Sequence, residues 1–203
     1  MIVYEHKNYE DYLSAQVQRS KRRTNYGRRL LSWISEEDLL GVNRLIHIYK
    51  NDIKTIICHG CRNGLEVDVF QKQNPTAKVF GTDIYGKAYQ YDRTYFREMD
   101  FDIVPEEWKE YFDVIYSNSI DHSRDPINTL LAWEMELKKG GICFVVFNYG
   151  GEVNQADCSH LDGIDYKSET KETGKKVNMT VLYISDQYKD IYGNICANVI
   201  LSR

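Results

Sequence analysis

The stretch that decides the fold is Ile56-Ile57-Cys58-His59-Gly60-Cys61-Arg62-Asn63-Gly64-Leu65-Glu66, residues 56–66. It begins within a β-branched apolar run that predicts a buried strand over Ile53–Cys58. The amphipathic residues that follow predict a helix over Leu65–Lys72. Gly60 permits a sharp turn, and Gly64 lets the helix begin close to the strand and to a ligand. The stretch therefore predicts a strand, a glycine turn and a helix.

The same alternation of strands and helices continues along the chain. Further strands are predicted over Ala77–Thr82, Tyr95–Met99, Asp113–Ser117 and Ile142–Phe147, and a helix over Pro126–Lys138. Strands that alternate with helices are typical of parallel βαβ units, whose central strands are buried on both faces.

The two ends of the chain differ from this alternation. Two strand-like runs, Val177–Ser185 and Asn194–Leu201, are joined by a short link and should pair antiparallel. Helices are predicted over residues 8–23 and 35–49, the second capped by Ser35. We therefore predict an α/β, Rossmann-like, doubly wound sheet of seven strands, mostly parallel, with an antiparallel C-terminal strand and N-terminal helices. Residues 1–50 would form a helical cap segment, and residues 51–203 the sheet domain.

Composition and charge describe a globular protein. The net charge of −4 argues against a surface that binds nucleic acid throughout. Most of the N-terminal positive charge lies in a basic tract, residues 19–29, which is either a solvated helix face or a patch for an anionic substrate, a partner or RNA. No signal peptide or run of about 20 apolar residues is visible, and the five cysteines are scattered. We therefore expect a cytoplasmic protein with reduced thiols and no membrane span.

Polar residues follow the predicted strands at the edge where doubly wound sheets bind ligands. Asp83 ends the second strand about 20 residues after the glycine turn, where a carboxylate can accept hydrogen bonds from ribose hydroxyls. Asp100 follows the third strand and could accept from an adenine amino group, with Phe101 covering the ring. Asn118 follows the fourth strand and faces the same crevice.

These strand-end residues, in this order, resemble the class I S-adenosylmethionine-dependent methyltransferase family. The resemblance runs from about Ile53 to the C-terminus, including Lys138-Lys139-Gly140-Gly141 before the fifth strand. It implies that the chain binds S-adenosylmethionine and transfers the methyl group to a nucleophile. The residues that it implies for the cofactor are Gly60, Cys61, Arg62, Gly64, Glu66, Asp83, Ile84, Asp100, Phe101 and Asn118.

Two positions depart from the family pattern. The family usually has an acidic residue where this chain has Cys58, so a carboxylate expected near the methionine end of the cofactor is missing. It usually has a glycine where this chain has Arg62. Arg62 either binds the cofactor carboxylate or the substrate, or forms an ion pair with Glu66 four residues later.

Other ligands fit the sequence less well. A nicotinamide dinucleotide fingerprint needs glycines at the third and sixth positions of the turn, where this chain has Arg62 and Leu65. Cys58 and Cys61 lack the second cysteine pair of a zinc site, and Cys58 is expected to be a small buried side chain. The segment from Cys158 to Asp162 is expected to be a polar surface loop. We therefore predict no metal site.

Asp121 and His122 lie in an unusually polar segment at the mouth of the expected crevice. Methyl transfer is an in-line attack, so an enzyme mainly positions the nucleophile, and a base such as His122 helps when the acceptor must lose a proton. Either residue is a candidate for a catalytic role; the alternative is a hydrogen-bonded loop that shapes the site. The long polar link over residues 149–176 is expected to act as a lid over the acceptor pocket.

The sequence therefore predicts methyl transfer to an oxygen or nitrogen of a small-molecule or saccharide-type acceptor. Two alternatives stay open: an RNA methyltransferase that uses the basic tract, and a protein that binds S-adenosylmethionine or a nucleotide without catalysis. The sequence gives no indication of the oligomeric state.

Overall fold

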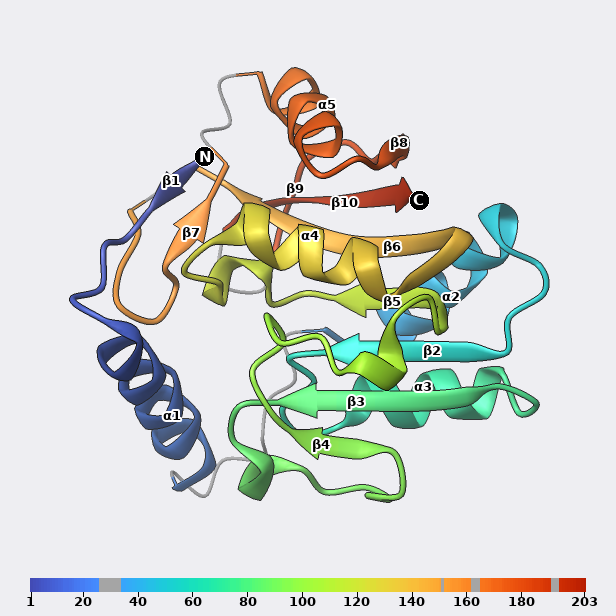
Figure 1. The fold of residues 1–203 in the computed structure, drawn as a ribbon, viewed down its shortest axis with the longest axis horizontal. Helices are drawn as coiled ribbons and strands as arrows, with labels where there is room; N and C mark the ends of the chain where they lie inside the picture. Colours follow the sequence, from blue (N-terminus) through green and yellow to red (C-terminus); the bar gives the residue numbers. More distant parts are fainter. Residues whose placement is uncertain (26–33, 151, 162–164, 191–193) are drawn as a thin grey trace.

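The computed structural model describes residues 1–25, 34–150, 152–161, 165–190 and 194–203. Its centre is a sheet with the strand order β4-β3-β2-β5-β6-β10-β8, and the short β9 also pairs with β10 (Figure 1). The strands of this sheet are β2 (Thr55–His59), β3 (Lys78–Asp83), β4 (Phe96–Glu98), β5 (Phe112–Ser117), β6 (Leu137–Tyr149), β8 (Thr180–Ile184), β9 (Tyr188–Lys189) and β10 (Ile195–Ser202).

The directions of the strands confirm the predicted doubly wound sheet. Strands β4, β3, β2, β5 and β6 are parallel, whereas β10 is antiparallel to β6 and β8. The seven predicted strands form the continuous path, and β9 is an addition that the sequence did not indicate. Every residue of β2 and β5 is buried, as expected of central parallel strands. The strand order reverses between these two strands, which places a crevice at their carboxyl ends.

Two helices cover each face of the sheet. The helices are α2 (Glu36–Tyr49), α3 (Leu65–Gln73), α4 (Pro126–Glu136) and α5 (Tyr166–Lys176). Leu39 of α2 and Phe70 of α3 belong to the hydrophobic cluster on one face, and Trp133 of α4 to the cluster on the other. Ser35 and Asp38 form the predicted cap of α2, with Ser35 Oγ accepting from the Asp38 backbone. Within the described residues, none of the helices combines the length and apolar character that crossing a bilayer requires.

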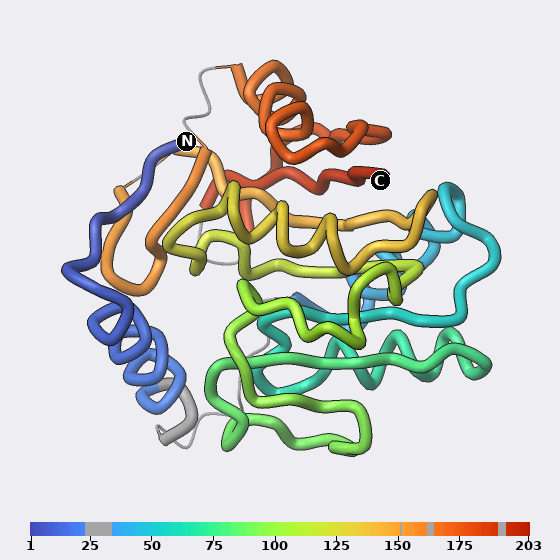
Figure 2. Tube along the Cα trace, in the orientation of Figure 1, coloured from blue at the N-terminus to red at the C-terminus, as the bar shows by residue number. Residues whose placement is uncertain are grey.

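Helix α1 (Tyr9–Asn25) lies on neither face but at the carboxyl ends of the parallel strands (Figure 1). The chain before it forms β1 (Ile2–Val3), which pairs antiparallel with β7 (Ser159–His160), far away in the sequence. The backbone N–H of Tyr4 also donates to the Cys158 carbonyl at 2.7 Å. Figure 2 shows the N-terminal segment running beside this part of the chain. The pairing anchors α1 across the end of the sheet.

The predicted helix over Pro126–Lys138 is too long. It ends at Glu136, because Leu137 already pairs with Phe112 at the start of β5. Asp125 caps the helix, accepting from the Asn128 backbone.

The long link after β6 also differs from the prediction. It contains β7 and helix α5, which packs beside β8 as the connection between β6 and β8. The few apolar residues in α5 gave no helical periodicity, which is why the sequence indicated only a polar link. The expected surface loop is wrong for Cys158 and His160, which are both buried, while Asp162 lies outside the described residues.

The carboxylate of Asp113 ties the start of β5 to the start of β2. It accepts hydrogen bonds from the backbone N–H groups of Lys54 at 2.8 Å and Thr55 at 2.9 Å. Lys138 Nζ lies 3.0 Å from its other oxygen. Burial raises the pKa of Asp113, but the bonds from Lys138 and the Lys54 backbone outweigh burial and hold it below its usual value.

We predict that Asp113→Ala lowers the free energy of unfolding by about 2–3 kcal/mol at pH 7, because two backbone donors lose their acceptor. Because the pKa of Asp113 is lower in the folded protein than in the unfolded protein, its carboxylate stabilises the fold at pH values above the unfolded-state pKa. This contribution, and with it the loss in the variant, should shrink as the pH falls through the lowered pKa. Urea unfolding at pH 7 and pH 3 measures both effects. Asp52→Ala is the control, since Asp52 forms an exposed ion pair with Lys54 and should change stability little. An equal loss in the two variants would contradict the assignment.

Candidate functional site

Two cavities meet at the carboxyl ends of the parallel strands. The narrow cavity, of about 70 Å³, lies between the glycine turn and α1. The wide cavity, of about 1010 Å³, lies between α2 and the β9–β10 segment. Arg19, Asn118 and His122 line both cavities, so these three side chains lie where the cavities join.

The narrow cavity gathers most of the residues predicted to bind a cofactor. Those that line it are Gly60, Arg62, Glu66, Asp83, Ile84, Asp100, Phe101 and Asn118. Cys61 and Gly64 do not line it. Cys61 is buried and its backbone N–H donates to the Thr82 carbonyl, while Gly64 begins α3 beside the Tyr89 ring. These two residues contribute to the shape of the turn without facing the cavity.

The backbone of the glycine turn has left-handed conformations at three positions. Gly60 has φ +69°, and a Cβ there would lie 2.6 Å from the Cβ of Ser119. Gly64 has φ +87°, and its Cβ would lie 2.5 Å from the Tyr89 ring. Arg62 has φ 36°, which explains why a glycine is usual at this position and why arginine there is strained. Glycine is therefore required at two positions by close packing as well as by conformation.

Asp83 holds this turn in place. One of its carboxylate oxygens accepts from the Arg62 backbone N–H at 2.9 Å, and the other accepts from Tyr85 at 2.9 Å. Burial raises the pKa of Asp83 to about 6, although both hydrogen bonds act in the opposite direction. Each oxygen keeps a second lone pair, so the carboxylate can still accept from a ligand.

Asp100 and Phe101 lie under α1. Tyr9 Oη of α1 donates to Asp100 at 2.9 Å, and burial followed by this bond raises the pKa of Tyr9 to about 12. The Phe101 ring makes edge contacts with His59 and Trp133, which fix its plane. The predicted adenine acceptor is therefore bonded to α1 in this structure.

Helix α1 also makes the narrow cavity small. Its Tyr12 and Gln16 form part of the wall. A volume of about 70 Å³ is below the range of about 300–1,000 Å³ typical of small-molecule pockets. A nucleoside-sized ligand therefore needs more room than this cavity has, and α1 is the wall that belongs to neither hydrophobic cluster of the sheet.

Asp121 and His122 lie in the short 3-10 helix η3 (Ile120–His122) after β5. Asp121 accepts a hydrogen bond from Asn148 Nδ2 at 2.9 Å, and burial raises its pKa. Nδ1 of His122 lies 2.8 Å from the Ala156 carbonyl and 2.6 Å from a terminal guanidinium nitrogen of Arg19. Burial, and then the charge of Arg19, lower the pKa of His122. His122 is therefore a neutral imidazole at pH 7.

Arg19 links α1 to this segment. A terminal guanidinium nitrogen lies 2.7 Å from His122 Nε2 and 2.6 Å from the Asp157 carboxylate. Asp121, His122 and Asp157 could together hold a cation, with ligand atoms within 4.8 Å of one another. The Arg19 guanidinium already supplies positive charge to this group, and we assign no metal to it.

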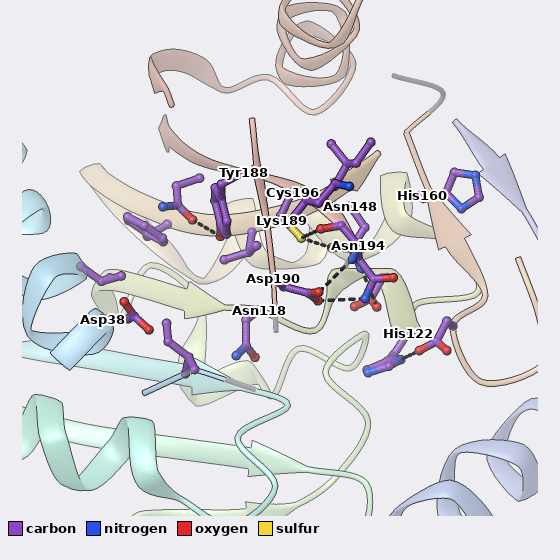
Figure 3. Close-up of a pocket in the computed structure, with 18 of the residues that line it drawn as sticks. Asp38, Asn118, His122, Asn148, His160, Tyr188, Lys189, Asp190, Asn194 and Cys196 are labelled. Carbon is purple, nitrogen blue, oxygen red and sulfur yellow. Dashed lines mark hydrogen bonds and ion pairs between the residues drawn. The ribbon is translucent and has the colours of Figure 1, made fainter. Parts of the chain in front are cut away.

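The walls of the wide cavity combine polar and apolar surface. Figure 3 shows Asp190, Asn194 and Asn148 gathered together, while Asn118 and His122, which also line the narrow cavity, lie at other points of the wall. Asp190 accepts from the backbone and the side chain of Asn194, which orders this wall. Apolar contact is also available from Val42 and Phe144. Polar donors and acceptors beside apolar surface suit a small molecule that carries polar groups.

Sequence reasoning missed several of these residues. Tyr9, Gln16 and Arg19 come from α1, Asn148 from the end of β6, and Asp157 from the chain after β6. The basic tract was the one available signal for Arg19, and its position between His122 and Asp157 differs from a solvated helix face. Arg28 and Arg29 of that tract lie outside the described residues.

Comparisons with known proteins agree with the fold. No family model matches the sequence, and no curated protein matches it by sequence. The chain is similar to the structure of 1,6-didemethyltoxoflavin-N1-methyltransferase from Burkholderia thailandensis with bound 1,6-didemethyltoxoflavin and S-adenosylhomocysteine. The TM-score is 0.75 at 13% identity, over 100% of this chain and 93% of that one.

Two further structures show the breadth of the similarity. A SAM-dependent methyltransferase from Aquifex aeolicus has a TM-score of 0.59 at 11% identity, over 91% of this chain and 96% of that one. The cyclase SpnF has a TM-score of 0.66 at 13% identity, over 95% of this chain and 93% of that one. The chain therefore has the predicted methyltransferase fold. Identities this low show the fold alone, and one of these relatives is named for a different reaction.

We predict that Gly60→Ala lowers the free energy of unfolding by about 3 kcal/mol, through conformational strain and overlap with Ser119. Gly140→Ala is the matched control: its φ is +70°, but a Cβ there would meet nothing within 4 Å. Strain alone should cost the control about 1 kcal/mol. Chemical denaturation of both variants measures the difference, and equal losses would show that Ser119 is not in the way.

Proposed function

We propose that this chain, with its methyltransferase fold, binds S-adenosylmethionine in the narrow cavity and methylates a small molecule held in the wide cavity. The observation that carries the proposal is the convergence of the predicted cofactor residues on one cavity, which joins a second cavity at Asn118 and His122. The similarity to a methyltransferase that is named for a small molecule supports it.

The residues of the narrow cavity fit the parts of this cofactor. The lack of a side chain on Gly60 lets the ligand approach the backbone closely. Asp83 would accept from the ribose hydroxyls, and Asp100 from the adenine amino group once Tyr9 releases it, with Phe101 against the ring. Buried carboxyl groups also suit a ligand with two positive charges. When bound, the cofactor supplies an electrophilic methyl group on its sulfonium.

The acceptor would be an oxygen or nitrogen nucleophile of a polar small molecule, including a saccharide. The lining of the wide cavity supports this class through Asn148, Asp190 and Asn194. His122 is at the junction of the cavities and would take the proton that the acceptor loses. To do so, Nε2 must be released by Arg19, which keeps Asp157 as a partner. Asp121 would orient the acceptor or the loop.

The N-terminal residues would act as a cap in this proposal. Helix α1 covers the narrow cavity and has to shift for the cofactor to enter. Helix α2 instead packs in the hydrophobic cluster of the sheet. We propose a cap segment over residues 1–50 and a cofactor-binding domain over residues 51–203, with α1 as the moving part.

The proposal predicts that the protein binds S-adenosylhomocysteine with a dissociation constant in the micromolar range, measured by calorimetry. Asp83→Asn should weaken this binding about tenfold, because one ribose acceptor becomes an amide nitrogen. Release of S-adenosylhomocysteine from S-adenosylmethionine across a panel of amines and alcohols then identifies the acceptor. No binding of either compound at millimolar concentration would overturn the proposal.

A second prediction concerns the base. Because the folded-state pKa of His122 is lowered, the rate of methyl transfer should rise with pH and reach half of its maximum below the pKa of about 6.5 of an unperturbed histidine. His122→Gln should lower kcat about 100-fold and remove this pH dependence, while the affinity for S-adenosylhomocysteine changes little. A variant with the wild-type pH profile would show that His122 only shapes the site.

A second candidate function keeps the cofactor and drops methyl transfer. The departures at Cys58 and Arg62, and the cyclase among the structural relatives, favour it. It predicts tight binding of S-adenosylmethionine with no turnover on any acceptor. RNA as the acceptor has less support, because Arg19 of the basic tract points to His122 and Asp157.

A further inference from the structure

Glu66 has a buried carboxyl group that the interactions of the fold do not fully satisfy. It lies in the first turn of α3, is 5% exposed, and lines the narrow cavity. In the part of the chain that the structure describes, its Oε2 has no hydrogen-bond partner. A buried carboxylate oxygen without a partner is unfavourable, and proteins keep few of them unless a ligand binds there.

The charges around Glu66 leave room for a cation. Burial raises the pKa of Glu66 to about 7. Its own backbone, the charge of Arg62 and a hydrogen bond from Asn118 lower this pKa, but burial outweighs them, and Asp83 raises it further. The carboxyl is thus only partly ionised at pH 7. A cationic ligand group beside it would complete its ionisation.

Cys58 lies beside the same carboxyl and carries no charge. Its thiol is buried, and burial followed by the nearby Glu66 raises its pKa well above the usual value. Cys58 comes from β2 and Glu66 from α3, so the two side chains reach one region from different elements. Of these two side chains, only Glu66 can therefore supply negative charge.

We propose that Glu66 binds the ammonium group of the amino-acid part of S-adenosylmethionine, supplying from α3 the carboxylate that β2 lacks at Cys58. This inference rests on the proposed function. A different role would be stabilisation of the start of α3, because an acidic side chain in a first turn favours a helix. The two roles differ in whether the ligand must carry an amino group.

The test compares two ligands by calorimetry. S-adenosylhomocysteine has the amino group, and 5′-methylthioadenosine has the same adenosine and thioether without the amino-acid part. Glu66→Gln should weaken S-adenosylhomocysteine binding about tenfold and leave 5′-methylthioadenosine binding unchanged within about twofold. Asp68→Asn is the control, since Asp68 is in the same helical turn but pairs with Lys72 at the surface. This control should change neither affinity.

A second variant moves the charge back to β2. Cys58→Asp combined with Glu66→Gln should recover S-adenosylhomocysteine affinity to within about threefold of wild type, because the carboxylate returns to the same region. Thermal unfolding of each variant verifies that it is folded.

The possible outcomes distinguish a failure of the role of Glu66 from a failure of the proposed function. Equal weakening of both ligands by Glu66→Gln, or no weakening of S-adenosylhomocysteine, overturns the role of Glu66 and leaves the proposed function standing. Wild-type protein that binds neither ligand overturns the proposed function itself. Selective loss of S-adenosylhomocysteine with recovery in the double variant supports the assignment.

Discussion

The site depends on one pair of hydrogen bonds, those that Asp83 accepts from the backbone of Arg62 and Tyr85. They connect the end of β3 to the turn between β2 and α3 and hold Arg62 in its strained left-handed conformation. This glycine turn also places Gly60 against Ser119 and directs Glu66 into the narrow cavity. A carboxylate that the sequence suggests for a ligand thus also builds the site that would receive it.

The second constraint is α1. The β1–β7 pair anchors the N-terminal segment to the chain after β6, and Tyr9 and Arg19 attach the helix to Asp100 and His122. Among the described residues, none from α1 belongs to the two hydrophobic clusters of the sheet, so α1 can move without disturbing them, although this movement exposes the buried Tyr12. The central strands are buried throughout and cannot move in this way. The structure therefore combines a rigid sheet edge with one movable wall.

Burial controls the electrostatics of this edge. It raises the pKa of Asp83 and Glu66 toward neutrality and lowers that of His122. Near pH 7 the Glu66 carboxyl is therefore only partly ionised and His122 is uncharged. Such a cavity favours a ligand that brings positive charge of its own, since Glu66 ionises fully only beside it.

The sequence by itself determined the alternation of strands and helices, the glycine turn and the order of polar residues at strand ends, because local periodicity and turn chemistry encode them. These local patterns were enough to predict the class of fold and most residues of the narrow cavity. Only the tertiary structure decided that α1 closes this cavity, that Arg19 contacts His122, and that β7 and α5 follow β6. The Arg19–His122 contact joins residues more than 100 positions apart, and such long-range contacts depend on packing that no local pattern records.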